Sequence, residues 1–285
     1  MTLTIAIPST SLSDCADLRQ KTAKVGQIAR ALAIYRVDKV VVYKTNRSTT
    51  DQIQDSNLLL KLLRYIDTPQ YLRRKIFPRS PALQFAGILP PLRTRSHPLY
   101  VKLSELSEGE IRWGIQVHHG KIDIGLERSI SYPESISERE PTLFRIIKKI
   151  PSIRLERITR EETEVYFGFE VDESNDLTEY LKSENNSVRI GLSRKGVQYH
   201  PLKDNVEAMA KNNRSVVIAL GGPRYGIRDL VKSKDDLKNN IDFWINTIQD
   251  QGTETVRLEE ALHASLAIIC PSIGPIVTKP GYYSQ

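Results

Sequence analysis

The hydrophobic positions in the N-terminal part of the chain follow two periods in turn. Residues 2–7 (TLTIAI) and 39–43 (KVVVY) are short, apolar, β-branched runs, as in strands that are buried on both faces. Between them, residues 18–35 place Val25 and Ile28 on one face of a helix. This part of the chain is therefore predicted to alternate strand and helix.

Two more helical segments follow, the first rich in leucine near 58–63. The second, TPQYLRRKIFP at 68–78, is short, basic and stopped by Pro78. A strand–helix repeat of this kind predicts parallel strands covered by helices. Residues 87–98 (GILPPLRTRSHP) contain three prolines and no helical period, so we expect a linker there.

From about 99 to 164 the pattern changes to short strand-like segments separated by glycines. The segments are YVKL, RWGIQVHH and KIDIGL. Such spacing predicts a small barrel or sandwich, and about 65 residues is the size of an OB-type barrel. The basic stretch 143–160 fits either a charged edge strand or a surface that follows phosphates.

The α/β pattern then resumes, so the small β module is predicted to be an insertion. We expect one α/β domain built from residues 1–92 and 165–285, interrupted by a β domain at 93–164. Strands are predicted at 165–171, 187–193, 215–220 and 242–248, with helices at 177–185 and 206–212.

The stretch 246–269 (NTIQDQGTETVRLEEALHASLAII) leaves a strand through an unusually long polar joint. Its second half has Leu258, Leu262, Leu266 and Ile269 at helical spacing. The joint itself holds several threonine, glutamine and acidic residues around one glycine, where a few turn residues would suffice. This excess of polar residues indicates a loop with a role of its own.

A buried strand followed by SVVIAL-GGPRYG suggests a dinucleotide site, but the glycine spacing excludes the Rossmann fingerprint. Gly221, Gly222 and Gly226 do not fit G-x-G-x-x-G, and Asp242 begins the next strand instead of ending it. The sequence instead offers glycine-containing loops after neighbouring strands, including SRKG at 193–196. Such loops can form a main-chain cup for a small ligand, although spacing alone favours ordinary surface turns.

Three stretches, taken in order, resemble the motifs of one enzyme superfamily. LRQKTAKVGQIARALAIYRVDKVVVY, GGPRYGI and NTIQDQGTETVRLEEALHASLAII are similar to motifs of the SPOUT methyltransferases. The similarity is strongest to the archaeal and eukaryotic branch with an OB-like insertion, which also shares TPQYLRRKIFP and LQFAGILPPL. It covers roughly residues 3–92 and 165–270.

The resemblance implies both a fold and a function. It predicts an α/β fold with a SPOUT-type parallel sheet, a C-terminal trefoil knot and an inserted OB-like β-barrel. It also implies an S-adenosylmethionine-dependent RNA methyltransferase that acts as a homodimer, most simply on N3 of a uridine in ribosomal RNA. Two residues depart from the usual motifs, namely Gln249 in place of a proline and Tyr225 in place of a frequent glutamate.

The resemblance also assigns site residues. Arg30 stands where related enzymes place a catalytic arginine, and the alternative is a surface arginine paired with Asp38 or with a phosphate. The residues implied in binding S-adenosylmethionine are Leu220, Gly221, Gly222, Pro223, Gly226, Ile248, Gly252, Thr253, Thr255, Val256 and Ala261. Independently of the resemblance, Thr253, Glu254 and Thr255 are expected to stiffen their loop through local hydrogen bonds.

Charge points to an anionic partner. The net charge is +7, and the excess of cations lies in residues 1–92, while residues 166–285 are slightly acidic. An RNA-facing role is predicted for Arg19, Arg36, Arg73, Arg74, Lys75, Arg145, Lys148, Lys149 and Arg154. A solvated basic surface is the alternative for each of them.

Composition limits the remaining possibilities. With 40% hydrophobic and 26% charged residues, the chain has the balance of a globular protein, and no apolar run is long enough for a membrane span. Two cysteines and five histidines lack metal-ligand spacing, so neither a metal nor a disulfide is expected, and a cytoplasmic location is predicted.

Two other functions remain open on the sequence. One is methylation of transfer RNA or of a ribose 2′-hydroxyl. The other is a non-catalytic RNA-binding or ribosome-assembly factor that keeps the knotted fold, an alternative suggested by Gln249 and Tyr225.

Overall fold

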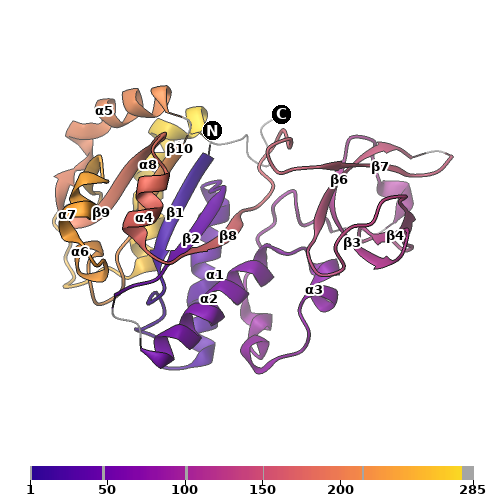
Figure 1. Ribbon diagram of the computed structural model, residues 1–285, viewed down its shortest axis with the longest axis horizontal. Coiled ribbons are helices and arrows are strands. Elements are labelled where there is room, and N and C mark those ends of the chain that lie inside the picture. Colours follow the sequence, from indigo (N-terminus) through magenta and orange to yellow (C-terminus); the bar gives the residue numbers. More distant parts are fainter. Residues whose placement is uncertain (1, 47–48, 100–101, 150, 214, 278–285) are drawn as a thin grey trace.

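The computed structural model describes residues 2–46, 49–99, 102–149, 151–213 and 215–277. Figure 1 shows two lobes side by side, a larger α/β lobe and a smaller β lobe. The larger lobe is built on a six-stranded parallel sheet with the order β11-β9-β10-β1-β2-β8. Its strands are β1 (Thr2–Pro8), β2 (Lys39–Tyr43), β8 (Glu170–Ser174), β9 (Ser187–Gln198), β10 (Ser215–Ala219) and β11 (Phe243–Asn246).

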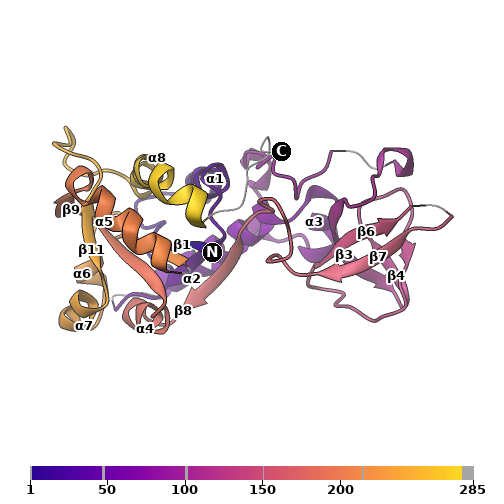
Figure 2. The same cartoon turned by 90° about the horizontal axis from the view of Figure 1, so that it is seen from above.

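Helices cover both faces of this sheet, as the continuous apolar strands predict. They are α1 (Leu18–Ile34), α2 (Thr50–Asp67), α4 (Leu177–Ser183), α5 (Tyr199–Asn212), α6 (Ile227–Leu230), α7 (Lys234–Asn239) and α8 (Leu258–Val277). Figure 2 shows α1, α5 and α8 on one side of the sheet and α4 and α7 on the other. The expected alternation of strands and helices is therefore confirmed for this lobe.

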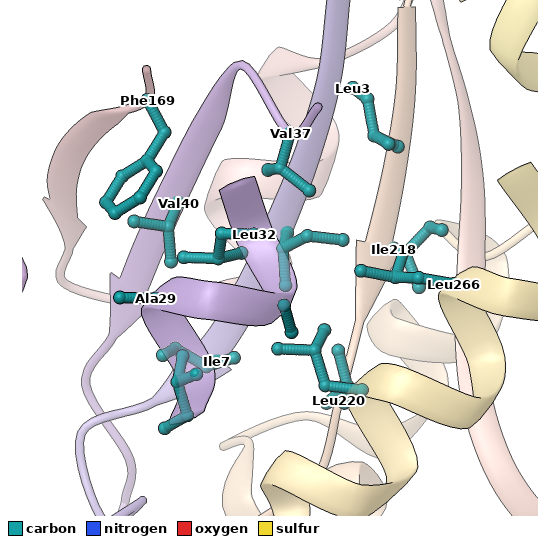
Figure 3. Packing of buried hydrophobic residues seen from close by; sticks show 14 of the residues in the cluster. Leu3, Ile7, Ala29, Leu32, Val37, Val40, Phe169, Ile218, Leu220 and Leu266 are labelled. Carbon is teal, nitrogen blue, oxygen red and sulfur yellow. The ribbon is translucent and has the colours of Figure 1, made fainter. Parts of the chain in front are cut away.

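Alternate residues of each central strand enter different cores. Ile5 and Ile218 lie in the cluster under α1, α2, α5 and α8, whereas Ala6 and Val217 lie under α4, α6 and α7. Figure 3 shows Leu32 of α1 packed in the first of these clusters. Burial on both faces explains why β1, β2 and β10 contain few polar residues.

Side chains at the helix starts fix where the helices begin. Asp17 accepts a hydrogen bond from the Gln20 amide at 2.8 Å and caps α1. Thr49 and Gln52 form a reciprocal capping box at the start of α2. At the start of α4, the Asp176 side chain accepts hydrogen bonds from the main-chain amides of Thr178 and Glu179.

The strand predicted at 165–171 is displaced, since β8 begins only at Glu170. The apolar residues before it are buried without joining a ladder. Gly168 has φ +83°, and a Cβ there would lie 2.3 Å from Asp67 Oδ1. The Phe169 amide donates to that same carboxylate at 3.0 Å. Aromatic burial in an irregular segment produced the misleading strand pattern.

The smaller lobe is a five-stranded antiparallel sheet with the order β5-β4-β3-β6-β7. Its strands are β3 (Ile111–His118), β4 (Lys121–Asp123), β5 (Ile130–Ser131), β6 (Thr142–Lys148) and β7 (Arg154–Ile158). In the described part of the chain β5 and β7 are its edges. The edge-strand interpretation of the basic stretch 143–160 therefore holds for β7 but not for β6, which pairs with strands on both sides. Of the strand expected at YVKL, residues 100–101 lie outside the described residues, and Leu103–Glu105 forms a 3-10 helix instead.

The short basic helix α3 (Gln70–Ile76) packs on the smaller lobe (Figure 1). Tyr71 donates from its hydroxyl to the Trp113 carbonyl at 2.8 Å, and its ring lies against Gly125. Lys75 forms an ion pair with Asp123. At the junction, Arg160 binds Asp67 of α2 at 2.8 Å. Within the described ranges, no helix is long and apolar enough to cross a bilayer.

Candidate functional site

A cavity of about 520 Å³ opens at the carboxyl ends of β9, β10 and β11. Its walls are the loops that follow β10 and β11, an irregular part of β9 and the first turns of α8. In open α/β sheets, ligands bind at this edge of the sheet. The volume lies in the range of pockets for small molecules.

The loop after β10 needs glycine for steric reasons. A Cβ on Gly221 would lie 3.0 Å from both Gly226 Cα and Tyr225 O, and one on Gly222 would lie 3.1 Å from Thr10 Oγ1. The Gly222 amide donates to Tyr225 O at 2.9 Å and closes the turn. The loop is therefore tight, and its residues line the cavity.

The long polar joint after β11 is held by its own side chains. Asn246 accepts from the Ile248 amide at 3.0 Å and donates to Arg194 O at 3.1 Å. Gln251 Nε2 donates to Thr253 O at 2.8 Å, and Thr253 Oγ1 donates to Thr255 O at 3.0 Å. These bonds confirm that local hydrogen bonds stiffen the loop, and they explain its polar composition.

The third wall is a bulge in β9, whereas the sequence predicted a separate loop at SRKG. β9 pairs with β11 through Gly191 and Trp244, and the register then jumps to Val197 and Ile245. Residues 192–196 are thus pushed out of the ladder, and 192–195 line the cavity. A Cβ on Gly196 would lie 2.6 Å from the Ile245 carbonyl carbon, which explains the glycine at that position.

Most residues that the sequence assigned to cofactor binding meet at this cavity. Those that line it are Leu220, Gly221, Gly222, Pro223, Gly226, Ile248, Thr255, Val256 and Ala261. Gly252 and Thr253 do not line it, and a Cβ on Gly252 would meet nothing within 4 Å. The glycine of the joint is thus not required for a close approach.

Several lining residues were not predicted from the sequence. Trp244 lies in the wall, and its indole Nε1 is buried without a hydrogen-bond partner in the described part of the molecule. Thr247 and Ser265 share a hydrogen bond of 2.7 Å between the joint and α8. The small Ser265 on the apolar face of the predicted last helix was the one signal that could have indicated such a contact.

Arg30 does not line the cavity of its own chain. It lies on α1, partly buried, and its Nη1 donates to Leu92 O at 2.8 Å and to Pro91 O at 3.3 Å. A Cβ on Gly26 of the same helix would lie 2.6 Å from Pro90 Cδ. Residues 90–92 of the linker therefore pack closely along α1, and Arg30 binds the carbonyl oxygens of Pro91 and Leu92.

The predicted RNA-facing cations differ in their availability. Arg73 donates to Ile66 O and Thr68 O, and its guanidinium lies over the Tyr65 ring. Burial lowers the pKa of Arg73.

Three other predicted cations have partners within the protein. Arg145 donates to a carboxylate oxygen of Glu156 and to Glu162 O. Lys149 donates to Ser104 O, and Lys75 forms an ion pair with Asp123. Arg36 is partly buried with φ +56°. Arg19, Arg74, Lys148 and Arg154 are exposed.

His263 and the two cysteines are buried or partly buried. In the described ranges, no group of three metal-ligating side chains gathers. His263 packs edge-on against Tyr35 with ring centroids 6.0 Å apart. Burial raises the pKa of Cys270 to about 12 and that of Cys15 to about 11, so both stay as thiols at neutral pH.

The fold and the cavity define an α/β protein with a cavity of small-molecule size at the carboxyl edge of a parallel sheet. The model of the family described as "Putative RNA methyltransferase" matches residues 2–269. The chain therefore belongs to this methyltransferase family, as the motifs at 18–43, 221–227 and 246–269 indicated.

Similar proteins come from archaea and animals. An uncharacterised protein of Halobacterium salinarum is 30% identical over 93% of this chain and 98% of its own length. The 28S rRNA (uridine-N3)-methyltransferase of Mus musculus is 26% identical over 98% of this chain and 78% of its own. A solved structure, the SpoU methyltransferase AviRb from Streptomyces viridochromogenes, gives a TM-score of 0.31 at 8% identity, covering 94% of this chain and 60% of that one.

Proposed function

We propose that this protein transfers a methyl group from S-adenosylmethionine to N3 of a uridine in ribosomal RNA. The observation that carries the proposal is a cavity formed by the loops after β10 and β11 in a chain of an RNA methyltransferase family. The mouse, fruit fly and human relatives named 28S rRNA (uridine-N3)-methyltransferase support the base and the type of RNA.

The cavity suits a cofactor with apolar and polar parts. Leu220, Ile248 and Val256 offer an apolar wall, and Gly221 and Gly222 leave space beside the main chain that a Cβ would fill. S-adenosylmethionine supplies, when bound, a methyl group activated by a sulfonium. The loops would hold it and exclude water.

Arg30 would stabilise the acceptor base. N3 of uridine must lose its proton to become a nucleophile, and the negative charge spreads onto the two flanking carbonyl oxygens. A guanidinium donates to such an anion and keeps its own proton throughout. Because Arg30 lies outside the cavity of its own chain, a second copy would have to supply it. The proposal therefore includes a homodimer.

Two exposed apolar side chains support such a dimer. Ile34 at the end of α1 is 49% exposed, and Ile268 on α8 is 39% exposed. The two helices pack against each other, and Tyr35 meets His263 between them. A dimer that packs along these two helices would remove both side chains from water.

The finer features of the fold belong to the same proposal. A trefoil knot would thread α8 through the segment that precedes it, and the position of α8 between α1 and α5 supports this path (Figure 2). The antiparallel sheet of the smaller lobe supports an OB-like insertion, with β5 and β7 as the strands that a closed barrel would bring together.

Hybrid dimers test the enzyme and the role of Arg30 together. Arg30→Ala alone should keep S-adenosylmethionine binding by calorimetry and lose radiolabelled methyl transfer to ribosomal RNA. Gly221→Ala alone should lose donor binding. Random mixing of the two variants makes half of the dimers hybrids. In a hybrid, the Arg30→Ala subunit keeps an intact donor cavity and the Gly221→Ala subunit supplies Arg30, so one of the two sites is complete. The mixture should therefore show about a quarter of the wild-type rate. Undiminished transfer by Arg30→Ala alone would refute its role.

The second candidate function is a non-catalytic RNA-binding or ribosome-assembly factor, which Tyr225 and Gln249 suggest. Both lie in loops that form the cavity, at positions where related motifs commonly have other residues. An assembly factor would bind RNA without binding the donor. Calorimetry that detects no binding at millimolar S-adenosylmethionine would therefore favour this alternative over the enzyme.

A further inference from the structure

The mouth of the cavity carries an excess of positive charge. Its basic residues are Arg194, Lys195, Arg224, Arg228 and Lys234, and its acidic residues are Asp229 and Glu254. Asp229 is already paired with Lys234, at 3.7 Å. The segment from residue 166 to the end is slightly acidic as a whole, so this positive charge is concentrated at the cavity.

The charge does not match the proposed donor. S-adenosylmethionine carries a sulfonium and an ammonium group against one carboxylate, and its net charge is positive. A positive rim opposes such a cation and attracts an anion. The inference below therefore rests on the proposed function, because it assigns these cations to the second substrate, a nucleic acid with a phosphate backbone.

Two of the basic residues at the cavity mouth, Lys195 and Arg224, are available for a phosphate. Two others are engaged within the protein: Arg194 donates to Glu254 O at 3.0 Å, and Arg228 lies over the Trp244 ring, 4.6 Å from its centroid. Lys195 and Arg224 are exposed, and neither side chain has a hydrogen bond or an ion pair with any residue that the structure describes. These two cations come from different walls of the same cavity.

An aromatic ring stands next to one of these cations. Tyr225 lines the cavity and is 44% exposed. Its main chain is fixed, because Tyr225 O accepts from the Gly222 amide at 2.9 Å and lies only 3.0 Å from where a Cβ of residue 221 would be. A ring on a tight loop loses little further entropy on binding, and aromatic rings stack on unpaired bases.

We propose that Tyr225, Arg224 and Lys195 form a subsite for an unpaired RNA nucleotide at the mouth of the cavity. Tyr225 stacks on a base, and Arg224 and Lys195 bind the phosphates on either side of it. The RNA must be single-stranded here, because a base inside a duplex cannot enter a concave pocket. Tyr225 then has a role in acceptor binding, where related motifs commonly have a glutamate.

Fluorescence anisotropy with full-length protein tests the subsite. The probes are a labelled single-stranded RNA of the target ribosomal sequence and a duplex of the same length. Tyr225→Ala should weaken single-strand binding by about 5- to 100-fold without changing the slope of log K against log salt, and Tyr225→Phe should retain wild-type affinity.

The two cations should affect the salt dependence of binding instead. Arg224→Ala and Lys195→Ala should each reduce the slope of log K against log salt by about 0.7. Lys203→Ala, an exposed lysine outside the cavity wall, is the matched control and should leave both unchanged.

Donor calorimetry separates this proposal from the function on which it rests. Arg224→Ala and Lys195→Ala should bind S-adenosylmethionine as tightly as wild type or more tightly, since positive charge is removed. Tyr225→Ala, which removes no charge, should bind it as tightly as wild type. Loss of donor binding in these variants would instead place the rim in the donor site and overturn the subsite. The subsite would also be overturned if Tyr225→Ala bound single-stranded RNA with wild-type affinity. It would be overturned as well if Lys203→Ala lost as much RNA affinity as the subsite variants, or if the subsite variants lost as much affinity for the duplex as for the single strand. If wild type fails to bind the donor but the RNA results hold, only the enzymatic function fails.

Discussion

The hydroxyl of Tyr43 donates a hydrogen bond to the carbonyl oxygen of Leu220, 2.7 Å away and fully buried. Tyr43 ends β2, while Leu220 leads from β10 into the glycine loop of the cavity. Burial raises the pKa of Tyr43 far above its usual range, so the hydroxyl remains a donor at every working pH. One side chain distant in sequence thus fixes the start of a cavity wall.

Tyr43→Phe should destabilise the protein by about 1 to 3 kcal/mol, because it leaves a buried carbonyl without its partner. Urea unfolding followed by circular dichroism measures this loss. Tyr35→Phe is the matched control, since Tyr35 is only partly buried and keeps its ring contact with His263. Its effect should stay within about 0.5 kcal/mol. Equal effects of the two changes would show that the Tyr43 bond adds no stability.

Gly221→Ala should weaken S-adenosylmethionine binding by at least about tenfold, or 1.4 kcal/mol. The added Cβ would lie 3.0 Å from the main chain of residues 225 and 226, so the loop must open. Isothermal titration calorimetry measures the affinity. Gly252→Ala is the control, because its Cβ meets nothing within 4 Å and Gly252 does not line the cavity. A similar loss in both variants would contradict a specific role of the 221–226 turn.

Lys24 of α1 links the segment before that helix to the first turn of α8. Its ammonium lies 2.7 Å from Asp14 and 3.1 Å from Glu259 Oε2, at the first turn of α8. The Glu259 contact is an ion pair without aligned hydrogen-bond geometry. Both Lys24 and Glu259 are buried.

Lys24→Met should therefore cost about 3 to 5 kcal/mol in unfolding free energy, because a buried carboxylate loses its charge partner. Adding Glu259→Gln should recover part of that loss. Lys211→Met removes an exposed pair with Glu207 and should change stability by less than about 1 kcal/mol. Chemical denaturation gives all three values. If the double variant were no more stable than Lys24→Met, an unpaired Glu259 would not be the cause.

His97 should make stability depend on pH. Its Nδ1 lies 2.9 Å from Thr94 Oγ1 and its Nε2 lies 3.1 Å from Ile66 O, so the ring is held at both nitrogens between the linker and α2. Burial lowers its pKa from the ordinary value of 6.5. The unfolded chain then binds more protons than the folded one between the lowered pKa and 6.5, and stability falls as pH decreases through this window.

The His97 contribution should reach at most about 1.4 kcal/mol per pH unit. Thermal unfolding at pH 7.5 and 5.5 should show a larger loss for wild type than for His97→Gln, whose side chain does not titrate. His200→Gln serves as control, because His200 is exposed near the start of α5. The same pH dependence in wild type and His97→Gln would assign the effect to other groups.

Local pattern was sufficient to predict much of the larger lobe. The runs at 2–7, 39–43 and 215–220 became parallel strands because a buried parallel strand leaves a continuous apolar signature. Residues 165–169 carry a similar signature and form no strand. There, burial of aromatic rings around a left-handed Gly168 mimics the same pattern, and only the contact with Asp67 reveals the difference.

The sequence by itself determined the order of the elements, the glycine turn at 221–226 and the polar joint at 246–257. These features depend on residues close together in the chain, where periodicity, steric limits and local hydrogen bonds act. Tertiary structure alone decided that β9 bulges into the cavity, that Tyr43 supports Leu220, and that Arg30 faces the linker and not the cavity of its own chain. Each of these depends on contacts between distant segments, which leave no periodic trace in the sequence.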